Sequence, residues 1–248
     1  MRKIIAIGGG AIGKAGHAKD VLQIDREAIR LTGKKHPKLL FIPTASLDDE
    51  RYVKAAAIHF EKRLGCTVQN LLLYRDKPSK KEIKKKIFSS DIIYVGGGNT
   101  YRMMCFWRKM GIDKLLRMAA AKGIVLTGLS AGAICWFRQG NSDSRLYSSK
   151  SKKLIKVSGL NLIPTLVCPH YDSEKRRKPA LKKMMKKMSG IALALQDCTA
   201  LEVVEDRCRI LSTRKQSNAY KVYWKHGKFY HVKLKRDRFL SIEELVRK

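Results

Sequence analysis

The sequence predicts an α/β fold of one domain, residues 1–248, with a mostly parallel sheet flanked by helices and β-hairpin strands late in the chain. Apolar, β-branched runs alternate with segments of helical spacing through the first half of the sequence. These runs are continuously apolar, which is typical of strands buried on both faces of a sheet. Glycine-rich stretches follow three of the runs, where the carboxyl ends of parallel strands place functional sites.

The predicted elements follow in order. Strands are expected at Lys3–Ile7, Leu39–Pro43, Thr67–Tyr74, Asp91–Val95 and Ile124–Thr127. Helices are expected at 19–31, 48–64, 78–88, 100–109 and 112–122. The serine-rich stretch at 141–149 predicts a loop, and 174–188 has helical spacing. Short strands and hairpins that close one edge of the sheet are expected at Ile191–Leu195, Thr199–Val204, Cys208–Ser212, Tyr220–Trp224 and Lys228–Val232.

The charge is strongly positive: 53 Lys and Arg face 21 Asp and Glu, for a net charge of +32 over 248 residues. Such a protein attracts polyanions whatever its fold. The basic residues are spread along the chain, and no zinc-finger spacing or aromatic RNA-binding motif accompanies them. We therefore expect nucleic acid to bind only non-specifically, and a dedicated nucleic-acid-binding protein is the alternative.

The six cysteines form no CxxC pair and have no zinc-ligand spacing. Reduced thiols in a cytoplasmic protein are the expected state, with no metal site. No apolar run approaches the roughly 18 residues of a membrane span. The N-terminal stretch MRKIIAIGGGAIG is interpreted as a first strand without an export signal, so no membrane partner is expected.

The stretch TGLSAGAICWF contains one serine between two glycines, Gly128-x-Ser130-x-Gly132, directly after an apolar run. A hydroxyl on a sharp strand-to-helix turn is how several hydrolases present a nucleophile. Small residues in such a turn are also compatible with simple packing. Ser130 is therefore a candidate nucleophile that needs a base and an acid elsewhere in the chain.

Two further glycine stretches end predicted strands. Gly8–Gly13, GGGAIG, matches the G-x-G-x-x-G pattern of dinucleotide sites, but no acidic residue ends a second strand about 20 positions on, so a tight turn is the other interpretation. Gly96–Gly98 precedes Asn99 and Thr100. The N–H groups of these glycines are suited to binding an oxyanion. The alternative interpretation of the stretch is a strand-to-helix turn with Asn99 or Thr100 as helix cap.

Among the six histidines, His170 stands out because it follows an apolar run ended by Pro169 and opens the polar loop HYDSE. It is the candidate general base, and a purely structural role is the alternative interpretation. The acidic candidates are Asp197, at a break between two predicted strands, Asp143, in the loop between Ser130 and His170, and the group Asp172, Glu202, Glu205 and Asp206. The order Ser130, His170, Asp197 differs from the Ser, Asp, His order of α/β hydrolases.

GGGNT at 96–100, GLSAGA at 128–133, PHY at 169–171 and DCTAL at 197–201 occur together in this order. The combination resembles the serine peptidase family of aspartyl dipeptidase (peptidase E) and cyanophycinase, over nearly the whole chain. The stretch GAICWFRQGNSDS at 132–144 is most similar to its peptidase E-like branch. The resemblance implies a fold like class I glutamine amidotransferase domains. Those enzymes, however, use cysteine instead of serine at the sharp strand-to-helix turn that presents the nucleophile, which is called the nucleophile elbow.

The resemblance also implies residue roles. Ser130 matches the nucleophile and His170 the general base. Asp197 falls where the family has its third acidic member, often glutamate, and Asp143 matches an acidic position that peptidase E carries after its elbow. Gly98 and Ala131 match the backbone donors of the oxyanion hole.

Substrate binding is assigned to three residues. Asn99 adjoins the second glycine stretch, and Arg176 and Arg177 lie where the family carries an arginine that recognises an N-terminal aspartate, with plain surface charge as the alternative. The implied reaction is acyl transfer on small peptides, possible without metal or cofactor, by a monomer or homodimer. An esterase, an amidase or an inactive relative on the same fold are the other readings.

Overall fold

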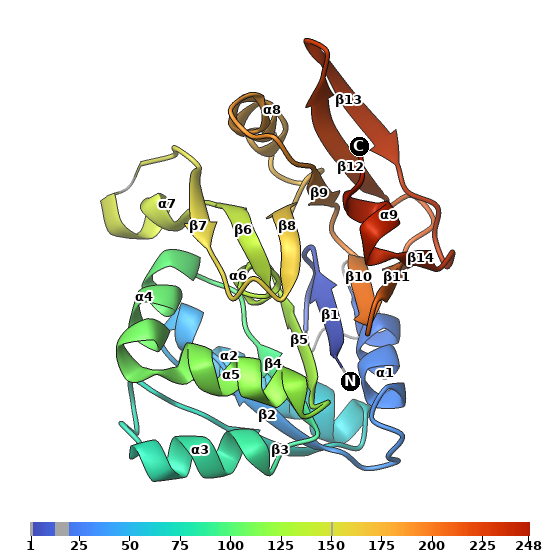
Figure 1. Ribbon diagram of the computed structural model, residues 1–248. Helices are drawn as coiled ribbons and strands as arrows, with labels where there is room; N and C mark the ends of the chain where they lie inside the picture. Colours follow the sequence, from blue (N-terminus) through green and yellow to red (C-terminus); the bar gives the residue numbers. More distant parts are fainter. Residues whose placement is uncertain (1, 13–19, 150) are drawn as a thin grey trace.

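The computed structural model describes residues 2–12, 20–149 and 151–248, and it confirms the predicted α/β fold (Figure 1). Two sheets carry the strands. The first has eight strands in the order β14-β11-β10-β1-β5-β4-β2-β3, and the second has six in the order β13-β12-β9-β8-β6-β7. Both sheets contribute to the largest core cluster of buried side chains.

The first sheet has a parallel centre. Strands β1, β5, β4, β2 and β3 are parallel neighbours, and β10, β11 and β14 extend the sheet antiparallel beyond β1. Its strands are β1 Lys3–Ile7, β2 Lys38–Ile42, β3 Thr67–Asn70, β4 Ile92–Val95, β5 Val125–Leu129, β10 Thr199–Val204, β11 Arg207–Ser212 and β14 Leu240–Ser241.

Both faces of the first sheet are covered, which explains the continuous apolar runs. Ile4 of β1 faces the cluster that contains residues of α3, α4 and α5, whereas Ile5 faces the cluster that contains residues of α1 and α2. The helices are α1 Leu22–Arg30, η1 Thr44–Ser46, α2 Glu50–Ala57, the π-helical turn η2 Ile58–Arg63, α3 Lys80–Phe88, α4 Thr100–Met110, α5 Ile112–Ala121, α6 Ala131–Ile134, α7 Ser144–Ser149, α8 Arg177–Lys186 and α9 Ile242–Val246.

The second sheet is the main departure from the predicted architecture, which had one sheet. Strands β6, β8 and β9 are parallel neighbours, and β7 and the β12–β13 hairpin flank them antiparallel. Its strands are β6 Phe137–Ser142, β7 Ile155–Ser158, β8 Ile163–Cys168, β9 Ala192–Leu195, β12 Ala219–Lys225 and β13 Lys228–Lys233. The late strands are therefore divided between two sheets, and the β12–β13 hairpin projects from the body (Figure 1).

Two local predictions were wrong. The strand expected at Thr67–Tyr74 ends at Asn70, and the chain continues as a turn in which Leu71 and Leu73 are individually buried. The loop expected at 141–149 is the end of β6 followed by α7. Hydrogen bonds between the hydroxyl groups of Ser142 and Ser144 and from the Ser144 N–H to the Ser142 hydroxyl form this junction.

Gly13, the last residue of the G-x-G-x-x-G match, lies outside the described residues. Within the described part of the chain, none of the helices combines the length and apolar composition that a membrane crossing requires.

Candidate active site

Ser130 lies at the sharp turn between β5 and α6. Its backbone has φ 57° and ψ −108°, a conformation that is strained for a residue with a side chain. Its N–H donates to the carbonyl of Ile7, at the end of the neighbouring parallel strand β1, at 3.0 Å. The predicted turn is therefore present, and it projects the hydroxyl from the carboxyl edge of the first sheet.

The two glycines around the serine are required by close packing. A Cβ on Gly132 would lie 2.0 Å from the carbonyl oxygen of Val95, and a Cβ on Gly128 would lie 2.6 Å from the same atom. Both distances are far below van der Waals contact. Any larger residue at either position would push the elbow away from the end of β4.

His170 comes from the second sheet, two residues after the end of β8. Its Nε2 is 2.9 Å from the Ser130 Oγ, and its Nδ1 is 2.7 Å from Oδ1 of Asp197. The carboxylate can only accept, so the Nδ1 carries a proton and donates it, which leaves Nε2 free to accept from the serine hydroxyl. This is the tautomer that a general base needs.

Asp197 lies in the crossover from β9 in the second sheet to β10 in the first. Its side chain is only 2% exposed, and its N–H donates to Oδ1 of Asp172 at 2.9 Å. Strands β8 and β9 are parallel neighbours with Cys168 opposite Ala194, so the residues that follow them, His170 and Asp197, emerge at the same edge. Asp172, one of the acidic candidates, thus holds the Asp197 backbone rather than the histidine.

Asp143, the rival acid, is placed elsewhere. Its Oδ2 lies 3.9 Å from Nη2 of Arg176 and 3.8 Å from Nη2 of Arg177. The carboxylate therefore forms ion pairs with these two guanidinium groups. Of the two aspartates, Asp197 is the one hydrogen-bonded to His170. Glu202 is bound by Arg209 at 2.5 Å, within β10 and away from the site.

The first glycine stretch packs directly against the histidine and the aspartate. The His170 N–H donates to the carbonyl of Gly8. A Cβ on Gly9 would lie 2.1 Å from Oδ1 of Asp197 and 2.4 Å from Nδ1 of His170. Close approach therefore accounts for these glycines without a dinucleotide. The sequence did not predict this role. A glycine run after the first strand indicates a turn, but it does not indicate which residues pack on the turn.

The second glycine stretch, at the end of β4, lies beside the elbow. Gly98 has φ 135°, and a Cβ there would lie 2.3 Å from the carbonyl oxygen of Ala45, so only glycine fits. The Gly97 N–H donates to the hydroxyl of the buried Tyr52 at 3.2 Å. Among the described residues, neither the Gly98 N–H nor the Ala131 N–H has a hydrogen-bond partner, so both remain available to a ligand.

Asn99 caps helix α4. Its Oδ1 accepts from the Arg102 N–H at 3.0 Å, and its Nδ2 donates to the Ser144 carbonyl at 3.3 Å. The residue is 3% exposed. The cap that the sequence offered as an alternative is thus formed, and the substrate contact assigned to Asn99 stays a prediction.

The two arginines assigned to substrate binding share a carboxylate that sequence reasoning left without a role. Arg177 is 1% exposed and Arg176 is 33% exposed, and both donate to Glu174. The signal for Glu174 was its position three residues before Arg177, a spacing that favours ion pairs on helices. Within the described residues, no group of three His, Cys, Asp or Glu side chains is arranged to hold a metal ion.

The cysteines are unsuited to be the nucleophile. Burial raises the pKa of Cys135, next to the elbow helix, well above its ordinary value. Burial also raises the pKa of Cys66 and of Cys168 to about 12. Only Cys105 among the six free cysteines is exposed. Because the thiolate is the reactive form, a pKa of about 12 lowers reactivity by about 10³ relative to an ordinary thiol.

We therefore expect iodoacetamide to modify one thiol of the folded protein, Cys105, and to leave peptidase activity intact. Peptide mapping by mass spectrometry would identify the alkylated residue, and a Cys105→Ser variant would show no labelling. Inactivation that follows the labelling of Cys135 would contradict this expectation and would indicate a thiol nucleophile.

An α/β fold with a serine on a strained strand-to-helix turn and a histidine beside it is typical of hydrolytic enzymes. The model of Peptidase family S51 matches residues 4–211, and the chain belongs to this family. The predicted peptidase class is thereby confirmed, and the protein is a hydrolase of peptide bonds.

Relatives agree with this assignment. The chain is 34% identical over 224 residues to "Uncharacterized peptidase YgaJ" of Bacillus subtilis (strain 168), which covers 90% of this chain and 92% of the relative. It is 34% identical over 164 residues to "Uncharacterized peptidase Lmo0363" of Listeria monocytogenes, covering 62% of this chain and 75% of the relative. The crystal structure of a peptidase from an acI-B1 Actinobacterium has a TM-score of 0.74 at 17% identity, covers 97% of each chain, and shares the fold.

Proposed function

We propose that the protein is a serine peptidase that hydrolyses small peptides, with Ser130 as nucleophile, His170 as general base and Asp197 as the acid that orients it. The observation that carries the proposal is the continuous chain of short hydrogen bonds, 2.9 Å from Ser130 Oγ to His170 Nε2 and 2.7 Å from His170 Nδ1 to Asp197 Oδ1. Nucleophile, base and orienting acid in this geometry suit acyl transfer.

In the first step the Ser130 Oγ attacks the peptide carbonyl carbon while His170 Nε2 takes the hydroxyl proton. Asp197 stabilises the imidazolium that forms, without itself taking up the proton. The Gly98 and Ala131 N–H groups would hold the oxyanion of the tetrahedral intermediate. Loss of one such donor typically costs about 3 kcal/mol in the transition state.

In the second step the intermediate breaks its C–N bond, and the imidazolium gives its proton to the leaving amine. The acyl group then remains on Ser130 as an ester. Water enters, loses a proton to His170 and attacks the ester carbonyl, so the serine is released with its proton restored. The described side chains supply every proton transfer of this cycle.

The test is amino-acid release from a panel of dipeptides and short peptides, run with wild type and Ser130→Ala side by side. The panel includes acidic, neutral and basic N-terminal residues, because the charges beside the site are of both signs. We expect release by wild type and a loss of at least about 10⁴-fold in kcat in the variant, since removing the nucleophile of a triad removes nearly all of its chemistry.

Two results would overturn the proposal. Equal release by wild type and Ser130→Ala would mean that Ser130 is not the nucleophile. Release from p-nitrophenyl esters but from no peptide would favour an esterase on this fold. Ser130→Ala differs from wild type by one oxygen atom, and circular dichroism of both proteins would confirm that the comparison concerns chemistry and not folding.

A further inference from the structure

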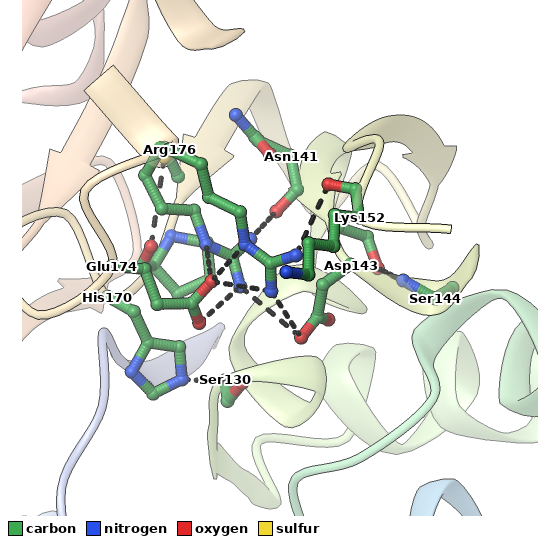
Figure 2. A network of polar contacts seen from close by, with 12 residues as sticks. Ser130, Asn141, Asp143, Ser144, Lys152, His170, Glu174 and Arg176 are labelled. Atoms are coloured by element: carbon green, nitrogen blue, oxygen red, sulfur yellow. Dashed lines mark hydrogen bonds and ion pairs between the residues drawn. The ribbon is translucent and has the colours of Figure 1, made fainter. Parts of the chain in front are cut away.

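Four charged side chains form a cluster beside the serine and histidine: Asp143, Glu174, Arg176 and Arg177. Strands β6 and β8 are parallel neighbours with Gly140 opposite Val167. Asp143 and His170 each follow three residues later, so they emerge at the same sheet edge. In Figure 2 the carboxylates of Glu174 and Asp143 are seen between the Arg176 guanidinium group and the Ser130–His170 pair.

Glu174 binds both arginines at once. Its Oε2 accepts from the Nε of Arg177 at 3.1 Å and from the Nε and Nη2 of Arg176 at 3.3 and 3.2 Å, and its Oε1 accepts from the Nη2 of Arg177 at 2.9 Å. The planar fork of each guanidinium is the group that binds a carboxylate in two-point fashion. In this protein both forks are already filled by a carboxylate of the chain itself.

The Nη1 group of each arginine donates to a backbone carbonyl of the protein. Arg177 donates from Nη1 to the carbonyl of Asn141 at 2.6 Å, and Arg176 donates from Nη1 to the carbonyl of Lys152 at 3.2 Å. Arg177 is 1% exposed, so a substrate would reach it only after the cluster opened.

The charges of the cluster cancel. The two guanidinium groups carry two positive charges, and Glu174 and Asp143 carry two negative charges when ionised. Burial raises the pKa of Glu174, but the hydrogen bond from Arg177 and the charges of the two arginines outweigh it, so the pKa lies below its usual range. When both acids are ionised, the four side chains therefore carry no net charge, and a third carboxylate beside Arg176 and Arg177 would compete with Glu174 and Asp143 for the same guanidinium groups.

We propose that Glu174 is a specificity-determining residue that occupies the place of a substrate carboxylate, so that the enzyme favours peptides with an uncharged N-terminal residue over peptides with N-terminal aspartate. This inference rests on the proposed serine peptidase function. The proposed preference is the opposite of the preference for N-terminal aspartate that the two arginines alone would suggest. The reason is that both guanidinium groups are already paired with Glu174.

The first test needs only the wild-type protein. Asp-Leu and Asn-Leu differ by the charge of one side chain and have nearly the same shape. We expect kcat/KM for Asn-Leu to exceed that for Asp-Leu by about 10-fold or more. A higher kcat/KM for Asp-Leu would overturn the inference while leaving the serine peptidase intact, provided that Ser130→Ala abolishes both activities.

The second test frees the arginines. Glu174→Gln keeps the side-chain length but removes the charge, and an amide cannot fill both forks as a carboxylate does. We expect this variant to raise kcat/KM for Asp-Leu by about 10-fold or more, mainly through KM, with a change of less than about 3-fold for Asn-Leu. Glu61→Gln, on the exposed side of η2, is the matched control and should leave both values as in wild type.

Three outcomes are decisive. A selective gain on Asp-Leu in Glu174→Gln supports the inference. An equal fall on both peptides with a lowered melting temperature would show Glu174 to be only a structural partner of the arginines, which would overturn the inference. Absence of any serine-dependent peptide cleavage would overturn the proposed function itself, and the inference with it.

Discussion

Replacing Asp197 by asparagine is expected to lower kcat for peptide hydrolysis by about 10⁴-fold with the fold unchanged. Asparagine keeps the size of the side chain, but its amide can donate a hydrogen bond to Nδ1 of His170. The histidine would then carry its proton on Nε2, the atom that must accept from Ser130. Steady-state kinetics on the best peptide of the panel would measure the loss, and circular dichroism would verify folding.

Asp143→Asn provides the comparison that separates the two acids. Asp143 lies beside the arginines at 3.8 and 3.9 Å, so we expect its removal to lower kcat by no more than a few-fold. A loss of 10³-fold or more in Asp143→Asn, with a small effect in Asp197→Asn, would reverse the assignment. The pair is informative because both changes remove one negative charge from the same edge of the protein.

Gly9→Ala is expected to lower kcat by at least about 100-fold, although Gly9 donates nothing to the chemistry. The new Cβ would lie 2.1 Å from Asp197 Oδ1 and 2.4 Å from His170 Nδ1, distances that no carbon atom can occupy beside them. The hydrogen-bonded pair must shift, and a misplacement of about 1 Å in a catalytic group typically costs about 10² in rate. The effect should appear in kcat rather than KM.

Gly190→Ala is the matched control, because a Cβ at Gly190 meets no atom within 4 Å and the glycine lies away from the site, before β9. We expect it to retain wild-type kinetics. Melting temperatures of both variants would show whether Gly9→Ala acts on the site or on the whole fold. Full activity in Gly9→Ala would mean that His170 and Asp197 do not pack on this glycine in solution.

Much of the fold was predictable because its signals are local. The continuous apolar runs predicted β1, β2, β4 and β5, and the segments of helical spacing predicted the helices between them. Ser79 and Asn99 cap α3 and α4 with their side chains, as residues of their type do at helix starts. These features depend on neighbours a few positions away.

The second sheet was not predictable in the same way. Strand β6 reads FRQGNS and is polar in composition, so its sequence gives no apolar strand pattern. Four of its six residues are nevertheless buried, because the strand lies between β7 and β8 and Gly140 packs on Ile134. The late strands gave a correct signal for extended structure, but nothing in their sequence states which sheet each joins. Strand pairing between distant segments decides that, and it has no local pattern.

The class of the protein and its candidate residues could be predicted from local sequence patterns. The Gly-x-Ser-x-Gly turn after a buried strand singled out Ser130, and a histidine and an aspartate at strand ends completed the candidate set. The folded arrangement was needed to show that Asp197 is the acid beside His170, that both pack on Gly9, and that Glu174 pairs with the two arginines. The physical reason is that a turn or an apolar strand is specified by adjacent residues, whereas a hydrogen bond between two sheets depends on the order and register in which their strands assemble.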